Sequence, residues 1–290
     1  MSHVLVFGAN GMLGHELVKR LPAGEIIGVG RSEVDITIPD AVDQAVAGSA
    51  VVINSAAYTA VDDAESNKNA AFAVNADGAR NIAVACRRHN ARLIHLSTDY
   101  IFDGNNASPY TEASPGNPQS VYGASKYAGE QAVLTEWAEQ SVILRTSWLY
   151  GVHGQSFPRT ILLAGQKNAH LDVVDDQTGQ PTWTGDVVNM ISQLLAHDVH
   201  RGVFHATNSG STTWHGFASA LFELAGWDVN RVRKTSSDAY VRPAPRPQYS
   251  VLGHENWTSH GLPTPRDWRE ALAEAWSSGL STFAHAEDGR

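Results

Sequence analysis

The chain has 290 residues, 42% of them hydrophobic and 18% charged, which is the composition of an ordinary globular protein. Its formal net charge of −9 argues against nucleic acid or an anionic membrane surface as a partner, and we find no apolar run of the about 18 residues that a membrane-spanning helix needs. The single cysteine, Cys86, excludes an intramolecular disulfide, and the N-terminus lacks the pattern of a signal peptide, so we expect a cytoplasmic protein.

Short apolar runs alternate with helical patterns through residues 1–150. Runs typical of buried strands occupy 4–8, 25–30, 50–57, 92–97 and 141–148. Helical spacing occurs at 12–21, 41–48, 70–90 and 118–132. This alternation predicts an α/β fold with a Rossmann-type doubly wound parallel sheet and helices on both of its faces. Ligands of such sheets bind beyond the carboxyl ends of the strands, so the residues just after each strand are candidate site residues.

The regular alternation ends near residue 150. Residues 151–290 contain turn residues, aromatic residues and prolines, with helical patterns at 214–227 and 268–279. We expect this part to be mainly a smaller C-terminal lobe that binds the substrate, with some segments returning to the first domain. Gly165, Gly179 and Gly185 are interpreted as loop residues, and residues 286–290 as a frayed tail.

The turn after the first strand carries the sequence GANGMLG. Its three glycines permit a tight turn, a close approach of the backbone to a pyrophosphate, and close packing of the helix on the strand. Because they lie between an N-terminal strand and a helix, they predict that residues 1–150 form an NAD(P)-binding domain. A tight turn that binds nothing is the alternative. The predicted cofactor contacts at this turn are Gly8, Asn10, Gly11, Met12 and Leu13.

The end of the second strand distinguishes the two nicotinamide cofactors. An acidic residue there accepts a hydrogen bond from the 2′-hydroxyl of NAD, whereas an arginine accommodates the 2′-phosphate of NADP. Arg31 comes first and Glu33 only afterwards, which favours NADPH and leaves NADH as the second choice. Asp35 and Ile36 follow at positions suited to contact the adenine. A solvated Arg31 that binds nothing is the alternative.

Small side chains follow the third strand in NSAAYTAVDDAES. Ala56 and Ala57 are small enough to let a cofactor lie against the backbone, and Tyr58 and Thr59 complete the contacts that we predict there. A strand end of small residues packed beneath a helix is an equally good interpretation of this stretch alone.

Polar groups follow the fourth strand and begin the next helix. The sequence LSTDYIFDG places Ser97, Thr98 and Asp99 at the ligand-facing edge, where a hydroxyl can donate to a carbonyl oxygen. Tyr122 and Lys126 are four residues apart and share one helix face. An ammonium about 4 Å from the phenol would favour the phenolate by about 4 kcal/mol, or about 3 pKa units, which predicts a tyrosine able to transfer protons near neutral pH. A tyrosine packed beneath a lysine stem is the alternative.

Other polar residues are given structural roles. Asn75 and His95 occupy positions typical of hydrogen-bonded polar groups in a core. The thirteen histidines show no spacing typical of metal ligands, so we predict no catalytic metal. Four acidic residues are interpreted as charges on helix faces or in turns: Glu16, Asp62, Asp63 and Glu65.

Taken together, these motifs resemble the extended short-chain dehydrogenase/reductase superfamily and, within it, the dTDP-4-dehydrorhamnose reductase family. The resemblance covers essentially the whole chain. It rests on GANGMLG, NSAAYTAVDDAES, LSTDYIFDG, VYGASKYAGE, LRTSWLYG, DDQTGQPT and RPQYSVL. The first and fourth motifs mark the superfamily, whereas STDYIFDG, RTSWLYG and DQTGQPT are more specific to the reductase.

The resemblance implies hydride transfer from NADPH to the 4-keto group of dTDP-4-dehydro-6-deoxy-L-mannose, giving dTDP-L-rhamnose. It implies that Tyr122 protonates the alkoxide, that Lys126 holds the nicotinamide ribose and lowers the tyrosine pKa, and that Thr98 polarises the carbonyl. Asp99 and Trp148 would contact the sugar. The related 4,6-dehydratases carry an Asp-Glu pair beside the threonine, and here Tyr100 replaces the second carboxylate, so simple reduction fits better.

The C-terminal lobe carries the groups expected to bind the nucleotide sugar. DDQTGQPT and RPAPRPQYSVL contain Gln177, Arg242, Arg246 and Tyr249, which can hydrogen-bond or pair with a diphosphate. Of these, Gln177 and Arg246 are our predicted substrate contacts, and arginines that merely solvate a proline-rich loop are the alternative.

The resemblance leaves the assembly and the exact substrate open. Some family members bridge a dimer through Mg²⁺ held by two glutamates. Glu16 matches the first of them, but Gly185 occupies the second position, with Asp186 next to it. Both a monomer and a homodimer are therefore consistent with the sequence. The alternatives to the reductase are a 4-keto reductase or epimerase of another nucleotide sugar, and a non-catalytic regulatory relative.

Overall fold

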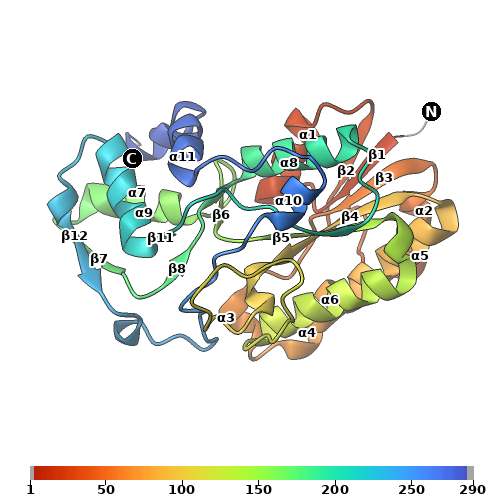
Figure 1. Ribbon diagram of the computed structural model, residues 1–290, viewed down its shortest axis with the longest axis horizontal. Helices are drawn as coiled ribbons and strands as arrows, with labels where there is room; N and C mark the ends of the chain where they lie inside the picture. The colour runs from red at the N-terminus through yellow and green to blue at the C-terminus, as the bar shows by residue number, and fades with distance from the viewer. Residues whose placement is uncertain (1–2, 286–290) are drawn as a thin grey trace.

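A six-stranded parallel sheet forms the centre of the larger lobe, which lies on the right in Figure 1. The computed structural model describes residues 3–285, so the expected tail at 286–290 lies outside the described residues. The strand order is β10-β5-β4-β3-β1-β2, which confirms the predicted doubly wound sheet. The strands are β1 (His3–Phe7), β2 (Ile26–Val29), β3 (Ser49–Asn54), β4 (Arg92–Thr98), β5 (Ser141–Thr146) and β10 (Gly202–His205).

Helices cover both faces of this sheet (Figure 1). The alternation of side chains along β1 explains the two layers, because Val4 and Val6 pack with α1 (Met12–Arg20) and α8 (Thr184–Ala196) on one face. Leu5 and Phe7 point to the other face. That face packs against α2 (Pro39–Val46), α5 (Ala79–His89) and α6 (Val121–Trp137).

The helix predicted over 70–90 is interrupted by a wider turn. It runs from α4 (Lys68–Phe72) through a π-helical segment at Ala73–Gly78 into α5, and ends at Asn90 in the left-handed conformation, with φ of 53°. Short π segments are frequent at functional sites. Here the segment contains Asn75, which contacts the loop after β3. That loop leads into the short helix α3 (Val61–Ala64).

The smaller lobe has its own core, built around three helices. These helices are α7 (Phe157–Lys167), α9 (Trp214–Leu224) and α11 (Trp268–Ser277). Their buried faces share one apolar cluster, with Phe217 at its centre. Three two-stranded sheets complete the lobe, and α10 (Glu255–Ser259) packs beside β10. The pairs are β7 (Leu171–Val174) with β12 (Val232–Thr235), β8 (Thr178–Gly179) with β11 (Thr212–Thr213), and β6 (Leu149–Tyr150) with β9 (Thr182–Trp183).

The interpretation of three glycines as loop residues was wrong. Gly165 lies within α7, Gly185 within α8, and Gly179 in the short strand β8. Each lies against a tryptophan, since a Cβ atom there would approach an indole ring within 2.5 to 2.6 Å. Trp227, Trp148 and Trp183 are the respective neighbours. The glycines therefore make room for large rings, and local sequence gives no sign of that packing.

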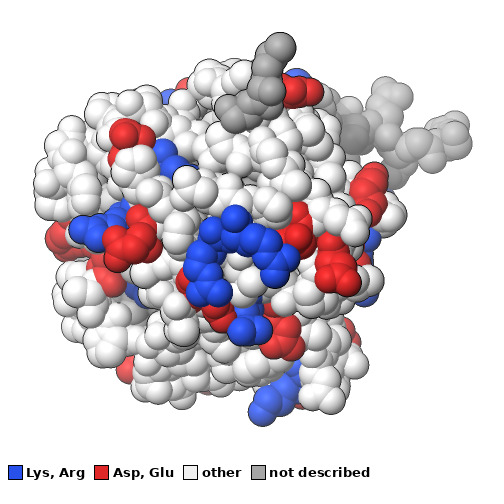
Figure 2. Space-filling model, turned by 90° about the vertical axis from the view of Figure 1, so that its right-hand side faces the viewer, with Lys and Arg blue, Asp and Glu red and all other residues white. Residues whose placement is uncertain are grey.

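The second half of the chain also contributes to the larger lobe. Within residues 151–290, α8 packs onto the sheet and β10 pairs with β5 as its edge strand. Figure 2 views the end of the larger lobe, where Lys and Arg side chains gather with Asp and Glu side chains beside them. Within residues 3–285, no helix combines the length and apolar character required to cross a membrane.

Candidate active site

The turn between β1 and α1 has the geometry of a phosphate-binding turn. Gly8 adopts a φ of +79°, and a Cβ atom there would lie 2.7 Å from the backbone nitrogen of Ala56. A Cβ atom on Gly14 would lie 2.1 Å from the carbonyl oxygen of Gly8, so both positions require glycine. Gly11 precedes Met12, the first residue of α1, and no side chain of residues 3–285 caps this helix. Its N–H groups therefore remain available to an anion.

The predicted adenosine contacts follow β2 at the same edge of the sheet. The Arg31 side chain is 82% exposed, and its Nε lies 3.6 Å from Asp35 Oδ2. The backbone N–H and hydroxyl of Thr37 both donate to Asp35 and lower the pKa of its carboxyl. Ile36 is buried, and its side chain lies against Gly78. Glu33 accepts a hydrogen bond from the N–H of Gly30 at 2.7 Å.

Asn75 organises the loop after β3, although its role could not be read from the sequence. Its Oδ1 accepts from the N–H of Tyr58 at 2.8 Å, and its Nδ2 donates to the carbonyl of the same residue at 3.1 Å. The same Nδ2 also donates to Ser125 Oγ at 2.9 Å. Asn75 thus links the loop that carries the predicted cofactor contacts to Ser125 of α6, the residue before Lys126. These predicted contacts are Ala56, Ala57, Tyr58 and Thr59.

Thr98, Asp99, Tyr122 and Lys126 come together at the carboxyl end of β4. The Thr98 hydroxyl donates to Asp99 Oδ1 at 3.0 Å and accepts from the N–H of Tyr100 at 3.2 Å. Ser120 caps α6 by accepting from Gly123 N–H, and this places Tyr122 in the first turn of the helix. Tyr122 is half-buried, and its ring lies edge-on to Tyr100 with centroids 5.5 Å apart.

The predicted lowering of the Tyr122 pKa was wrong for the protein alone. Burial raises the pKa of Tyr122 to about 12, while the Thr98 hydroxyl acts against this rise and the Asp99 carboxylate adds to it. The Lys126 ammonium is 3% exposed and donates to the carbonyl of Leu96 on β4 at 2.6 Å. Because this ammonium is directed at the strand, the phenol stays protonated at neutral pH. A protonated phenol is the form that a proton donor needs.

Two further groups at this point have shifted pKa values. Burial lowers the pKa of Lys126 to about 8, against the attraction of Glu130. Burial raises the pKa of Asp99 to about 6, and the hydrogen bond from the Thr98 hydroxyl opposes the rise. Asp99 is 2% exposed. Shifted pKa values of this kind cluster at functional sites.

Trp148 is held in an unusual backbone conformation by a second tryptophan. Its φ is +45°, which is rare for a bulky residue and is maintained only where the surroundings impose it. The Trp148 ring stacks on Trp214 with centroids 3.5 Å apart and planes 8° apart. Trp214 Nε1 donates to Gln177 Oε1 at 3.2 Å, and Gly179 leaves space beneath Trp148. The structure thus joins two predicted site residues through Trp214, which sequence reasoning missed.

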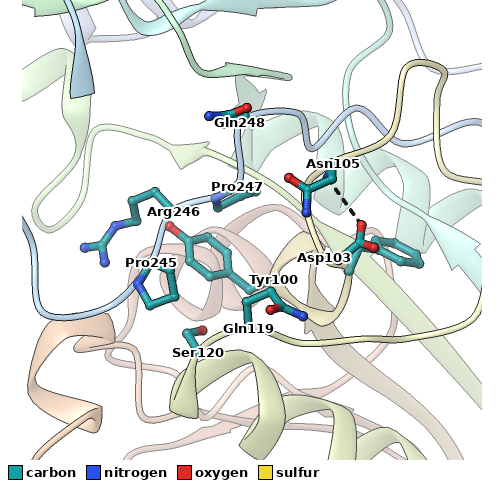
Figure 3. Close-up of a pocket in the computed structure, with 10 residues that line it drawn as sticks. Tyr100, Asp103, Asn105, Gln119, Ser120, Pro245, Arg246, Pro247 and Gln248 are labelled. Atoms are coloured by element: carbon teal, nitrogen blue, oxygen red, sulfur yellow. Dashed lines mark hydrogen bonds between the residues drawn. The ribbon is translucent and has the colours of Figure 1, made fainter. Parts of the chain in front are cut away.

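Arg246 lines two adjacent cavities of about 290 and 720 Å³. The smaller cavity contains Tyr100 and Ser120 (Figure 3), and the larger one contains Gln177, Trp214 and Arg242. Tyr249 lines neither cavity, and its N–H donates to the carbonyl of Gly104.

Asp62 lies in α3, consistent with its interpretation as a charge on a helix face or in a turn, and both of its oxygens accept from Arg246. Glu65 also has a specific role, since its Oε1 accepts from the N–H of Val121 at the start of α6. Asp63 accepts hydrogen bonds from Tyr58 and Asn67.

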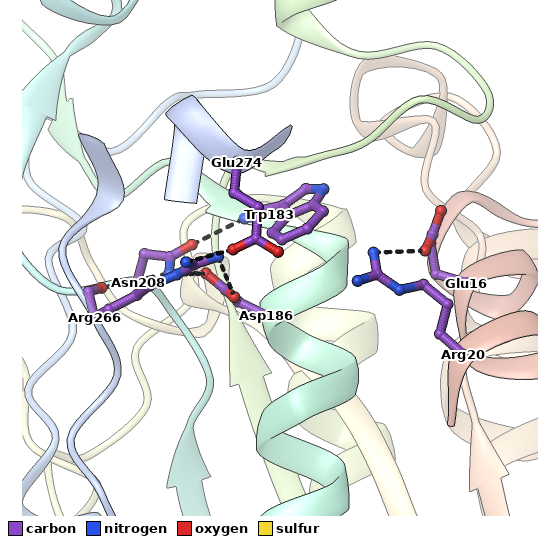
Figure 4. Close-up of polar contacts among 7 residues, drawn as sticks. All are labelled: Glu16, Arg20, Trp183, Asp186, Asn208, Arg266 and Glu274. Carbon is purple, nitrogen blue, oxygen red and sulfur yellow. Dashed lines mark hydrogen bonds and ion pairs between the residues drawn. The ribbon is translucent and has the colours of Figure 1, made fainter. Parts of the chain in front are cut away.

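The acidic residues suggested for a bridging metal are engaged within the chain. Asp186 accepts from Arg266 at 2.8 Å and from Asn208 at 2.6 Å, while Glu16 pairs with Arg20 at 3.4 Å (Figure 4). Glu16 lies in α1 and is buried as well as paired. Among the described residues one group has the composition of a metal site, and its ligand atoms lie within 4.8 Å of one another: His15, Glu16 and His153.

Comparison with known proteins identifies the family of this chain. The family model described as the RmlD substrate binding domain matches residues 1–280. A probable dTDP-4,6-dihydroxy-2-methyloxan-3-one 4-ketoreductase from Streptomyces antibioticus is 48% identical over 96% of this chain and 95% of its own length. A dTDP-4-dehydrorhamnose reductase from Streptomyces griseus is 46% identical over 94% and 92%, respectively.

The crystal structure of a dTDP-4-dehydrorhamnose reductase from Bacillus anthracis in complex with NADP superimposes with a TM-score of 0.92. It is 37% identical and covers 96% of this chain and 100% of its own. The chain described here therefore belongs to the RmlD substrate binding domain family, the family of the dTDP-4-dehydrorhamnose reductases.

Proposed function

We propose that this protein is an NADPH-dependent reductase that converts dTDP-4-dehydro-6-deoxy-L-mannose to dTDP-L-rhamnose. The observation that carries the proposal is the meeting of Thr98, Tyr122 and Lys126 at the end of β4, with only β3 between this strand and β1, which leads into the glycine turn. A protein that only bound a nucleotide would not need all three groups. This arrangement favours the enzyme over a non-catalytic regulatory relative.

The residues present fit a dinucleotide. The close approach of Gly8 to Ala56 leaves no Cβ in the path of a pyrophosphate, and the uncapped start of α1 offers N–H donors to it. Arg31 is exposed at the end of β2 and free to turn from Asp35 toward a 2′-phosphate. NADPH, when bound, supplies the hydride.

The side chains of this chain supply the proton and the orientation. Tyr122 is protonated at neutral pH and donates its proton to the oxygen that develops negative charge. Thr98 contributes a second hydroxyl at the same oxygen. Lys126, whose pKa burial lowers to about 8, holds the nicotinamide ribose.

The substrate side of the proposal rests on the larger cavity. Its volume of about 720 Å³ lies within the usual range for small-molecule sites, and it joins Gln177 and Trp214 to Arg242 and Arg246. The two arginines are suited to the diphosphate, and the Trp148–Trp214 stack offers an aromatic face to the sugar. Asp99 would hydrogen-bond a sugar hydroxyl.

A second candidate is the reduction of another dTDP-linked 4-keto sugar. The observation that favours it is the 48% identity to the probable 4-ketoreductase from Streptomyces antibioticus, which is as high as the similarity to the rhamnose enzyme. Thr98, Tyr122 and Lys126 would act in the same way on either sugar, so the two reactions differ only in the residues that surround the ring.

An NADPH-oxidation assay with dTDP-, UDP- and GDP-linked 4-keto-6-deoxy sugars tests the proposal. We expect the highest kcat/KM with dTDP-4-dehydro-6-deoxy-L-mannose and dTDP-L-rhamnose as the product. A higher value for another dTDP-4-keto sugar would establish the second candidate. The absence of NADPH oxidation with the whole panel would contradict both.

A further inference from the structure

Asp62 and Arg246 form a two-point contact between segments that are 184 residues apart. Arg246 Nη1 donates to Asp62 Oδ1, and Nη2 donates to Oδ2, both at 2.8 Å. The N–H of Ala244 also donates to Oδ1, at 3.2 Å. The Arg246 side chain is only 22% exposed, and the Asp62 side chain 30%. This paired, parallel geometry is the strongest form of an arginine–carboxylate contact.

The remaining donors of Arg246 point to a ligand. A guanidinium carries five N–H groups. Asp62 accepts one N–H from Nη1 and one from Nη2. The carbonyl of Ala244 accepts the second N–H of Nη1, at 2.9 Å. The Nε–H and the second Nη2–H have no acceptor within residues 3–285. They lie on one edge of the planar group, with the spacing that suits two oxygens of a phosphate.

The contacts around Arg246 fix the orientation of its Nε–Nη2 edge before a ligand binds. An arginine side chain loses rotamer entropy when it binds a ligand, and a fixed partner removes part of this loss beforehand. Hydrogen bonds from Arg246 lower the pKa of Asp62, so its carboxylate remains ionised at neutral pH. Arg242 Nη1 lies 3.9 Å from Asp62 and keeps the local charge positive.

We propose that Asp62 is a positioning residue that fixes Arg246 with its Nε–Nη2 edge open to the diphosphate of the nucleotide sugar. Asp62 itself does not touch the substrate and acts only through Arg246. This inference deepens the proposed function, because it rests on Arg246 as the phosphate ligand between the two cavities.

A double-mutant cycle tests the inference. Asp62→Ala, Arg246→Ala and the double variant are compared by their Kd for dTDP in calorimetry and their KM for the nucleotide sugar. Arg246→Ala should weaken both by about 10- to 100-fold, the effect of one charged hydrogen-bonded contact. Asp62→Ala should weaken both by about 3- to 10-fold. In the Arg246→Ala background, Asp62→Ala should have no further effect, and NADPH affinity should stay unchanged throughout.

Asp43→Ala is a matched control. Asp43 is also paired with an arginine at 2.8 Å and is 29% exposed. Its partner is Arg88, and the pair joins α2 to α5 in the larger lobe. It should leave Kd for dTDP unchanged. If Asp62→Ala does not fold, Asp62→Asn, which keeps one acceptor oxygen, should show a smaller shift in the same direction and completes the same cycle.

The outcomes separate this inference from the proposed function. A wild-type Kd in Asp62→Ala, a tighter Kd, or an equal effect of Asp62→Ala in both backgrounds would overturn the positioning role. A wild-type Kd in Arg246→Ala would overturn both the inference and the assigned phosphate contact. The predicted cycle for dTDP without NADPH oxidation by any sugar would support the inference and refute the reductase.

Discussion

Replacing Asp99 with asparagine should stabilise the protein at neutral pH. Asp99 is 2% exposed, and burial raises the pKa of its carboxyl from 3.8 to about 6. In the unfolded chain this carboxyl therefore ionises at a pH about two units lower than in the folded protein. As pH rises from about 4 to about 6, the folded state becomes less stable, and the full loss of about 3 kcal/mol persists above that window.

The variant removes the charge and keeps an oxygen that can accept from the Thr98 hydroxyl. Chemical denaturation at pH 7.5 should show an increase in the free energy of unfolding of up to about 3 kcal/mol relative to the wild type. At pH 4 the wild-type carboxyl is already protonated when folded, so the increase should nearly vanish. The gain at neutral pH should accompany a loss of activity, because Asp99 is a proposed sugar contact.

Asp103→Asn provides a control with the opposite sign. A hydrogen bond from the Tyr110 hydroxyl, at 2.6 Å, lowers the pKa of Asp103. Its ionised form stabilises the folded protein above the unfolded pKa, and this stability is lost as pH falls. Asp103→Asn should therefore destabilise the protein at pH 7.5 and less so at pH 4. Equal effects of Asp99→Asn at the two pH values, or a loss of stability at pH 7.5, would refute the claim that burial of this charge is costly.

Three further predictions concern turnover and binding. Tyr122→Phe should lower kcat by about 100-fold or more with little change in NADPH affinity, and wild-type turnover in a steady-state assay would exclude Tyr122 as the proton donor. Arg31→Asp should shift the ratio of kcat/KM values from NADPH toward NADH by about 1–3 kcal/mol, and an unmoved ratio would make Arg31 a surface residue only. Trp214→Ala should raise KM for the nucleotide sugar by about 3- to 10-fold through the loss of the stack on Trp148, whereas Trp214→Phe should retain most of the affinity. Equal KM values for the two variants would show that stacking on Trp148 does not contribute to substrate binding.

The cofactor half of this protein could be predicted because its signals are local. Residues 4–7 of β1 (His3–Phe7) form a continuous apolar run, and the glycines at 8, 11 and 14 follow in the turn and the first turn of α1. Tyr122 and Lys126 share a helix face by spacing alone. The family resemblance was carried by contiguous motifs of this kind, and the matches to known family members confirm it.

Burial and long-range contact were decided only by the tertiary structure. Spacing placed Lys126 beside Tyr122, but the carbonyl of Leu96 holds the ammonium and desolvation raises the tyrosine pKa instead of lowering it. The Asp62–Arg246 pair and the Trp148–Trp214 stack join residues far apart in the chain.

The physical reason is the range of the interactions. Helix and strand periodicity depends on neighbours within about one turn, so a sequence displays it directly. The pKa of a group and the partner of a side chain depend instead on atoms that the fold brings together from elsewhere. The sequence by itself therefore determined the sheet, the phosphate-binding turn and the reacting groups, and the packing of the two lobes determined their protonation and the residues that hold them in place.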